Sequence, residues 1–119
     1  MGSSQRHILV VDDDPVILDA LELMLEGYFR VLTAKSGSEA RKLIQCHSFD
    51  LLLTDYLLDD DRGDRLADYA ERGKVPAVLM TGFPQELARC QVACPVLVKP
   101  FDGQELLNVL RARLEVPRN

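Results

Sequence analysis

Five short, continuously apolar segments divide the chain, and most of them end at a polar or charged residue. Apolar segments of this length without alternation are typical of strands that are buried on both faces of a sheet. We therefore predict five strands with helices packed on either side. The predicted strands occupy residues 7–11, 29–34, 49–55, 76–82 and 95–100.

The segments between these strands carry the signals of helices. After the first strand, Asp14 is a predicted N-cap, Pro15 takes the first helical position and Gly27 is the predicted stop. Apolar residues spaced three to four positions apart predict the buried stripe of this helix. The stripe comprises Ile17, Ala20, Leu21 and Met24.

Two further helices begin with a capping box, in which a Ser or Asp is followed three residues later by Glu. These boxes pair Ser36 with Glu39 and Asp102 with Glu105. The predicted buried faces are Ala40, Leu43 and Ile44 in the earlier helix and Leu106, Leu107, Leu110 and Leu114 in the last one.

Two more predicted helices, over residues 64–71 and 84–91, complete five strand–helix units. Strands joined by helical crossovers run parallel, with right-handed connections. The predicted fold class is therefore α/β, a (βα)5 doubly wound sandwich of the flavodoxin-like type. We expect one domain over residues 6–116, a flexible leader or tag remnant over 1–5 and a tail over 117–119.

Composition narrows the function classes. The chain has 119 residues, a net charge of -5 and a pI of about 4.9, and its basic residues are scattered. Direct binding of nucleic acid, which needs a basic face, is therefore not expected. No segment approaches the ~20 apolar residues of a membrane span. Because a secretory leader is also missing, we expect a cytoplasmic protein without membrane insertion.

The cysteines indicate packing rather than chemistry. Cys46, Cys90 and Cys94 make an odd number, which is typical of a reducing compartment. Cys90 and Cys94 have the spacing of one helix face, but no His follows them at metal-ligand spacing. We expect free thiols rather than a soft-metal site.

Candidate chemistry gathers where the predicted strands end. Asp12 and Asp13 follow the first strand, Asp55 ends the third, Thr81 ends the fourth and Lys99 ends the fifth. Open α/β sheets bind ligands at the carboxyl edge, so we expect these side chains to converge there. Crowded carboxylates repel one another unless a cation is present, and a hard divalent ion such as Mg²⁺ is their natural partner. The hydroxyl and the ammonium would then bind an anion beside the metal.

Four segments at these strand ends, in this order, resemble the receiver domain of two-component response regulators. They read VVDDDP, LLLTD, VLMTG and VLVKPF, and the resemblance covers almost the whole chain. It implies strand order 2-1-3-4-5 and a phosphoacceptor domain of a phosphorelay, which switches conformation and is not an enzyme in its own right. The implied partner is a histidine kinase or a histidine phosphotransfer protein. Whether a kinase or output domain is linked to this chain is left open.

The resemblance also implies roles for individual residues. Asp55 would be the phosphoacceptor, and Asp12, Asp13 and the backbone carbonyl of Leu57 would bind Mg²⁺ with it. A second group would serve the phosphoryl oxygens and the turn beside them. It comprises Thr81 and Lys99 as phosphoryl-binding and switch residues, Gly63 as the family's glycine after the phosphoacceptor, and Pro100 as the site of a cis peptide bond.

Several positions depart from the family's pattern. Asp59 stands where the family usually has proline, and Val96 stands where it often has a switching aromatic ring. Thr81 and Lys99 are only 18 positions apart, so the fourth helix is expected to be short by about one turn. We therefore expect this domain not to use its fourth-helix face in the family's common way. A hybrid-kinase origin is one interpretation of this difference.

Two apolar residues bear on the lifetime of the phosphorylated state. Leu57 and Phe83 border the phosphoryl position in the family, and neither side chain can orient an attacking water. The resemblance therefore predicts slow intrinsic dephosphorylation. The acidic stretch around Asp59, Asp60 and Asp61 is expected to be a solvated loop rather than a second metal site.

Two other functions are open from the residues. The segment DDDPV also has the pattern of haloacid-dehalogenase-type phosphohydrolases, with Asp12 as nucleophile and Asp14 as acid/base. Against this class, the acidic motif expected after Lys99 is missing and the chain is short. The other alternative is a receiver-fold binding module that is never phosphorylated, and its mark would be a failure to bind Mg²⁺ or beryllofluoride.

Overall fold

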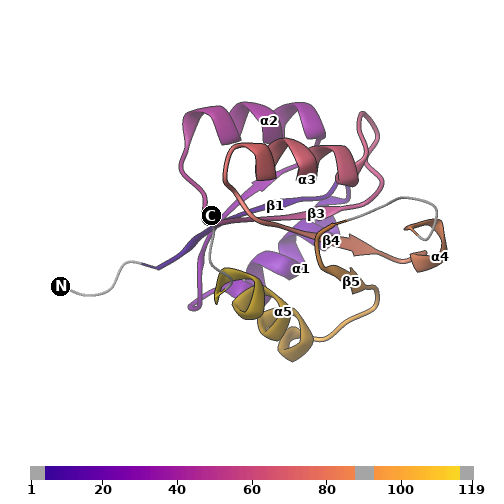
Figure 1. Cartoon of the computed structure of the whole chain (residues 1–119). Helices are drawn as coiled ribbons and strands as arrows, with labels where there is room; N and C mark the ends of the chain where they lie inside the picture. The colour runs from indigo at the N-terminus through magenta and orange to yellow at the C-terminus, as the bar shows by residue number, and fades with distance from the viewer. Residues whose placement is uncertain (1–4, 88–92, 116–119) are drawn as a thin grey trace.

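The computed structural model describes residues 5–87 and 93–115, and Figure 1 shows their arrangement. Within these residues the chain forms one parallel sheet in the order β2-β1-β3-β4-β5, as the family resemblance implied. The strands are β1 His7–Val11, β2 Arg30–Ala34, β3 Leu51–Asp55, β4 Ala77–Thr81 and β5 Val96–Val98. The helices are α1 Pro15–Leu25, α2 Gly37–Cys46, α3 Gly63–Arg72, α4 Pro84–Leu87 and α5 Gly103–Glu115.

The sheet is buried on both faces. Helices α1 and α5 lie on one face, and α2 and α3 lie on the other (Figure 1). Along β1, Ile8 and Val10 belong to the core cluster shared with α1 and α5, whereas Leu9 and Val11 belong to the cluster shared with α2 and α3. Because both faces need apolar side chains, the strand is apolar at every position.

The helix termini use the predicted caps. Asp14 Oδ1 accepts the amide of Val16 at 2.9 Å, and Gly27 takes the left-handed conformation after α1 with a φ of 87°. The first capping box forms in part, because Ser36 Oγ accepts the Glu39 amide at 3.1 Å but the Glu39 carboxylate accepts the amide of Lys35 at 2.8 Å. The second box forms in full. There, the Asp102 carboxylate accepts the amide of Glu105 at 2.8 Å, and the Glu105 carboxylate accepts the amide of Asp102 at 3.3 Å.

The predicted stripe of α1 was right in part, because Leu21 is buried and Ile17 packs against the core. Leu18, Leu21 and Leu25 are the residues that α1 buries, whereas Ala20 and Met24 are exposed. The two stripes share Leu21, and their centres differ by roughly 80° about the helix axis. Leu18 and Leu25 take the buried positions that we assigned to Ala20 and Met24, and burying a leucine contributes ~1.5–3 kcal/mol.

Parts of the sequence prediction fall on residues outside the described ranges. These are residues 1–4 of the leader, the tail 117–119, Cys90 and the end of the helix predicted over 84–91; its described part is α4, Pro84–Leu87. Of the other cysteines, Cys46 is exposed and Cys94 is half-buried, and burial raises the pKa of Cys94 to about 11. Among the described residues, no helix is both long enough and apolar enough to cross a membrane.

Candidate functional site

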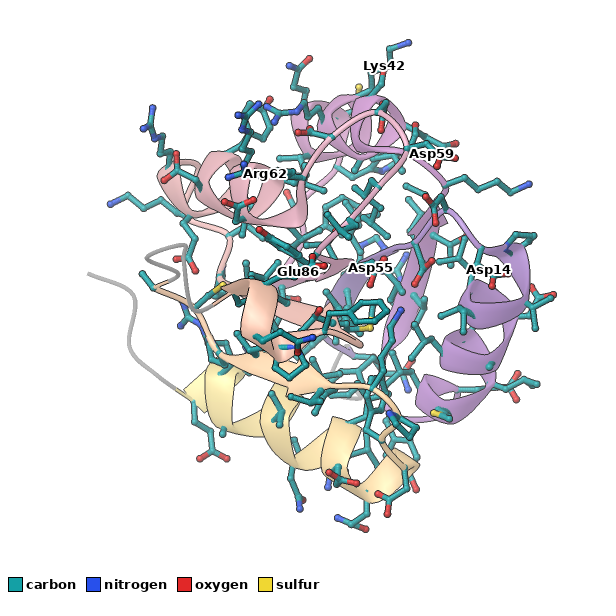
Figure 2. The ribbon with its side chains drawn as sticks, turned by 90° about the vertical axis from the view of Figure 1, so that its right-hand side faces the viewer. Asp14, Lys42, Asp55, Asp59, Arg62 and Glu86 are labelled. Carbon is teal, nitrogen blue, oxygen red and sulfur yellow. The ribbon has the colours of Figure 1, made fainter. Side chains whose placement is uncertain are left out.

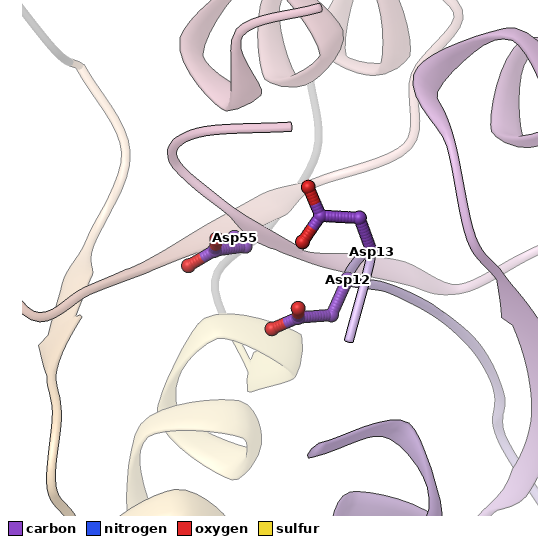
Figure 3. A group of neighbouring side chains, drawn as sticks. All are labelled: Asp12, Asp13 and Asp55. Atoms are coloured by element: carbon purple, nitrogen blue, oxygen red, sulfur yellow. The ribbon is translucent and has the colours of Figure 1, made fainter. Parts of the chain in front are cut away.

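Three carboxylates meet at the carboxyl edge of the sheet. Asp12 and Asp13 directly follow β1, and Asp55 is the last residue of the neighbouring β3. Each offers an oxygen, and these oxygens lie within 4.8 Å of one another (Figure 3). Parallel pairing in this register, with Val11 opposite Thr54, brings acids 43 positions apart in the sequence to one place.

Asp12 is the most deeply buried of the three and is held by the backbone. Its side chain is only 3% exposed, and its Oδ1 accepts the amide of Asp14 at 3.0 Å. Its own amide donates to the carbonyl of Ala34 at the end of β2. These bonds fix its remaining oxygen, Oδ2, on the side of the cluster where Lys99 lies.

Lys99 is the cation that the structure places among these acids. Its Nζ lies 3.2 Å from Asp12 Oδ2 and 3.0 Å from Asp55 Oδ1. The Lys99 amide donates to the carbonyl of Thr81 at 2.7 Å, and the Lys99–Pro100 peptide bond is cis. One ammonium therefore bridges carboxylates from two strands, and the four side chains together carry a formal charge of -2.

Burial and repulsion shift the titration of this cluster. Burial raises the pKa of the Asp55 carboxyl, the charges of Asp12 and Asp13 raise it further, and the bond from Lys99 only partly opposes them. The Lys99 pKa is raised as well. Burial alone would lower it, but the hydrogen bonds and negative charges of Asp55 and Asp12 outweigh the burial. Asp55 is thus a carboxylate whose negative charge the fold does not fully neutralise.

Asp13 meets a further acid from the loop after β3. Burial raises the pKa of Asp13, and the neighbouring Asp59 raises it further through its charge and a side-chain hydrogen bond. Figure 2 shows the loop of Asp59 beside Asp55 on the face onto which the strands open. The residue that replaces the family's usual proline therefore adds negative charge to the edge of the site.

Thr81 and Phe83 line the next loop along the sheet. Thr81 follows Met80, the residue that pairs with Asp55, and its side chain is buried. Its Oγ1 accepts the amide of Phe83 at 3.0 Å. The Phe83 side chain is 56% exposed, and Val96 on β5 is also partly exposed.

The sequence led us to expect a solvated acidic loop after Asp55, but two carboxylates of this loop bind α2. The Asp60 carboxylate accepts two amides of α2, from Gly37 at 2.8 Å and from Ser38 at 3.0 Å. Asp61 pairs with Arg41 of the same helix at 3.0 Å. The sequence signal for this arrangement is weak, because a glycine after an N-cap and an arginine one turn later are common on any helix.

The donor set is suited to a hard cation. Three carboxylate oxygens lie close together, and two of the carboxyls have raised pKa values. Carboxylate and carbonyl oxygens are the ligands that Mg²⁺ and Ca²⁺ prefer. The Leu57 carbonyl belongs to the loop that leaves Asp55. The residues present therefore fit a divalent ion, which would offset the charge that Lys99 leaves.

Comparison with known proteins agrees with this geometry. The family model described as the response regulator receiver domain matches residues 8–111. The chain is 34% identical to the transcriptional regulatory protein GlrR of Escherichia coli over 97% of this chain. It is also 34% identical to PdtaR of Mycobacterium tuberculosis over 86%. The chain spans 28% and 53% of the lengths of these two relatives.

Solved structures show the same fold. A CheY-like receiver domain protein from Methanospirillum hungatei superposes with a TM-score of 0.82 at 29% identity, covering 94% of this chain and 95% of that one. The response regulator TrrA from Thermotoga maritima, solved in complex with Mg²⁺ and BeF, superposes with a TM-score of 0.80 at 28% identity, covering 90% and 97%.

Proposed function

Because the chain belongs to the response regulator receiver domain family, we propose that it accepts a phosphoryl group on Asp55 within a two-component system or phosphorelay. Receiver domains are signalling phosphoacceptors rather than enzymes with a released product. The observation that carries the proposal is the convergence of Asp12, Asp13 and Asp55 with Lys99 between them.

Asp12, Asp13, Asp55 and the carbonyl of Leu57 would hold Mg²⁺. The clustered oxygens and the residual negative charge support this assignment, and the related TrrA was solved with Mg²⁺. When bound, Mg²⁺ supplies positive charge to the phosphoryl oxygens during transfer.

The transfer itself follows from the positions of the protein groups. An Asp55 carboxylate oxygen attacks the phosphorus of a phosphohistidine, a P–O bond forms as the P–N bond breaks, and the electron pair stays on the imidazole nitrogen. Lys99, which now bonds Asp55 Oδ1, would turn its ammonium to a phosphoryl oxygen. The transition state is loose, so positioning and charge neutralisation supply most of the catalysis.

Thr81 would couple the charge of the phosphoryl group to the loop after β4. Its hydroxyl now accepts the Phe83 amide and has its own proton free to donate to a phosphoryl oxygen. Such a bond would draw the loop after β4 toward the site, a shift between two packings of the same fold. With Val96 in place of an aromatic ring, this shift would not be coupled to a ring rotation.

A histidine kinase or a histidine phosphotransfer protein is the proposed donor. The names of the relatives describe transcriptional regulatory proteins, which supports a place in gene regulation for the full-length relatives. Hydrolysis of the acyl phosphate by water would reset the domain.

Labelling with a small phosphodonor tests the proposal. The protein is incubated with acetyl phosphate and MgCl₂, and the modified residue is located by peptide mapping after trapping of the acyl phosphate. We expect one HPO₃ unit on Asp55, loss of that unit in Asp55→Asn, and no labelling in EDTA. Label on Asp12 would support a phosphohydrolase instead, and a chain that binds neither Mg²⁺ nor beryllofluoride would be a binding module.

A further inference from the structure

The loop between β3 and α3 forms a tight turn with one end at the metal site. Leu57 and Arg62 pair as an isolated antiparallel bridge, and the Leu58 amide donates to the carbonyl of Asp61 at 3.0 Å. The turn of residues 58–61 therefore closes on itself directly after the carbonyl of Leu57. A displacement of its tip would be passed to that carbonyl.

The tip of this turn is bound to the start of α2. Both oxygens of Asp60 are used, Oδ1 for the amide of Gly37 and Oδ2 for the amide of Ser38. These amides belong to the first turn of α2 and have no partner within the helix. The two bonds hold the Asp60 pKa below its ordinary value, so the carboxylate is ionised at neutral pH and the bonds are charge-assisted.

The turn and the start of α2 are closely packed at this contact. A Cβ added at Gly37 would lie 2.6 Å from the Cβ of Asp61, so only glycine permits the approach. Asp61 also pairs with Arg41, which lies one helical turn further along α2. The turn is therefore fastened at two points on a helix that contributes no ligand to the site.

We propose that Asp60 is a positioning residue for the metal, which holds the Leu57 carbonyl in place by tethering its turn to the first turn of α2. This inference rests on the proposed function, because it assumes that Mg²⁺ binds at Asp12, Asp13, Asp55 and Leu57. Mg²⁺ demands near-ideal octahedral geometry at ~2.0–2.1 Å, so a loosely held carbonyl binds it poorly. By linkage, a bound ion must in turn hold the first turn of α2 more firmly.

Titration calorimetry with MgCl₂ tests the tether on the full chain. We expect Asp60→Ala to weaken Mg²⁺ binding about tenfold, the lower end of the loss typical for groups that orient metal ligands. The matched control is Ser36→Ala, which removes the hydrogen bond that the Glu39 amide donates to Ser36 Oγ but leaves both Asp60 bonds in place. It should lower stability and leave Mg²⁺ affinity within about twofold of the unmodified protein.

A second variant separates position from charge. Asp60→Asn removes the charge but keeps one oxygen acceptor, so a tether predicts an affinity between those of the unmodified protein and Asp60→Ala. A purely electrostatic contribution would make Asp60→Asn and Asp60→Ala equally weak and would overturn the inference.

Amide exchange gives a readout at the far end of the tether. Addition of Mg²⁺ should slow exchange of the Gly37 and Ser38 amides in the unmodified protein and in Ser36→Ala, but not in Asp60→Ala. Normal Mg²⁺ affinity in Asp60→Ala, or equal weakening in Ser36→Ala, would refute the tether while the proposed function stands. A failure of the unmodified chain to bind Mg²⁺ would refute the proposed function itself.

Discussion

Replacement of Lys99 by methionine removes the cation from the acidic cluster while keeping the volume of the side chain. Three carboxylates, Asp12, Asp13 and Asp55, would then face one another without a counter-charge from the protein. We expect the metal-free protein to be destabilised, and we expect divalent ions to reverse most of that loss. A lysine that merely lies on the surface would show neither effect.

The size of the effect follows from two ion pairs. At 3.0 and 3.2 Å, each pair attracts by about 5 kcal/mol at an effective dielectric constant of about 20, before desolvation is subtracted. Asp12 is almost fully buried and Lys99 is 26% exposed. Breaking a buried pair costs ~3–5 kcal/mol, and partial exposure reduces this. We therefore expect Lys99→Met to lower the free energy of unfolding by about 2–3 kcal/mol, or the Tm by about 6–12 °C.

Urea denaturation in EDTA and in MgCl₂ measures the effect. In MgCl₂ the difference between Lys99→Met and the unmodified protein should fall below about 1 kcal/mol, because the bound ion stabilises only the folded state. Lys99→Met should also bind Mg²⁺ about tenfold more tightly, since Lys99 competes with the ion for Asp12 and Asp55. The denaturant slope should not change.

The stability deficit of Lys99→Met should depend on pH in a definite direction. The folded-state pKa of Asp55 is already raised above its ordinary value, and loss of Lys99 removes the interaction that opposes the rise. The penalty for ionised carboxylates is therefore present above the raised folded-state pKa and fades as the pH falls through it. The deficit of Lys99→Met should be large at about pH 8 and smaller at about pH 5.

Lys42→Met is the matched control, because Lys42 is exposed on α2, away from the three carboxylates (Figure 2). It should behave like the unmodified protein under all of these conditions. An equal loss of stability in EDTA and MgCl₂, or the same loss at both pH values, would show that Lys99 contributes packing rather than charge and would refute the reasoning.

Three further predictions follow from the same site. Asp55→Asn should raise the free energy of unfolding in EDTA by about 1 kcal/mol near pH 8, because the fold disfavours the charged form of Asp55. The gain should vanish as the pH falls through the raised pKa of Asp55, and a variant that is less stable than the unmodified protein at about pH 8 and at about pH 5 would contradict this. Gly63→Ala should lower the free energy of unfolding by ~2–4 kcal/mol, because the added Cβ would collide with the carbonyl of Asp55. The control is Gly103→Ala, which should be neutral or slightly stabilising in thermal unfolding because its Cβ meets nothing within 4 Å. If Leu57 and Phe83 limit access of an oriented water, the Asp55 acyl phosphate should decay slowly. Leu57→Gln should then speed its decay about tenfold in a kinase-free assay, and an unchanged decay rate would show that Leu57 does not limit hydrolysis.

The strand ends made most of the site predictable. A parallel sheet brings the carboxyl ends of its strands to one edge, so the positions of Asp12, Asp55 and Lys99 in the sequence were enough to place them together. The strand order itself came from the resemblance, because apolar segments alone do not say which strands are neighbours.

Periodicity could not decide which face of α1 is buried. The predicted and observed stripes are centred roughly 80° apart about the helix axis, and both satisfy the spacing. The choice depends on the side chains that α5 presents across the core, which is tertiary information.

The Asp60 contact was unpredictable for a different reason. Asp60 and Gly37 are 23 positions apart, and the bonds are made by backbone amides, which every helix start offers. Only the close approach of the loop after β3 to the start of α2 selects this pair. Side chains that bind generic backbone groups leave little trace in a single sequence.

The charge of the cluster links these observations. Three carboxylates and one ammonium leave the edge of the sheet negative, and the core on both faces of β1 and β3 holds them together despite their repulsion. A phosphoryl group would add further negative charge at Asp55, so transfer is unfavourable unless cations converge on the same oxygens. The elements that would position those cations are the end of β5 at Lys99 and the turn at Leu57, and this turn is bound to α2 through Asp60. Binding of a cation at the site should therefore affect α2 as well as Thr81, and amide exchange can follow the residues of α2 one by one.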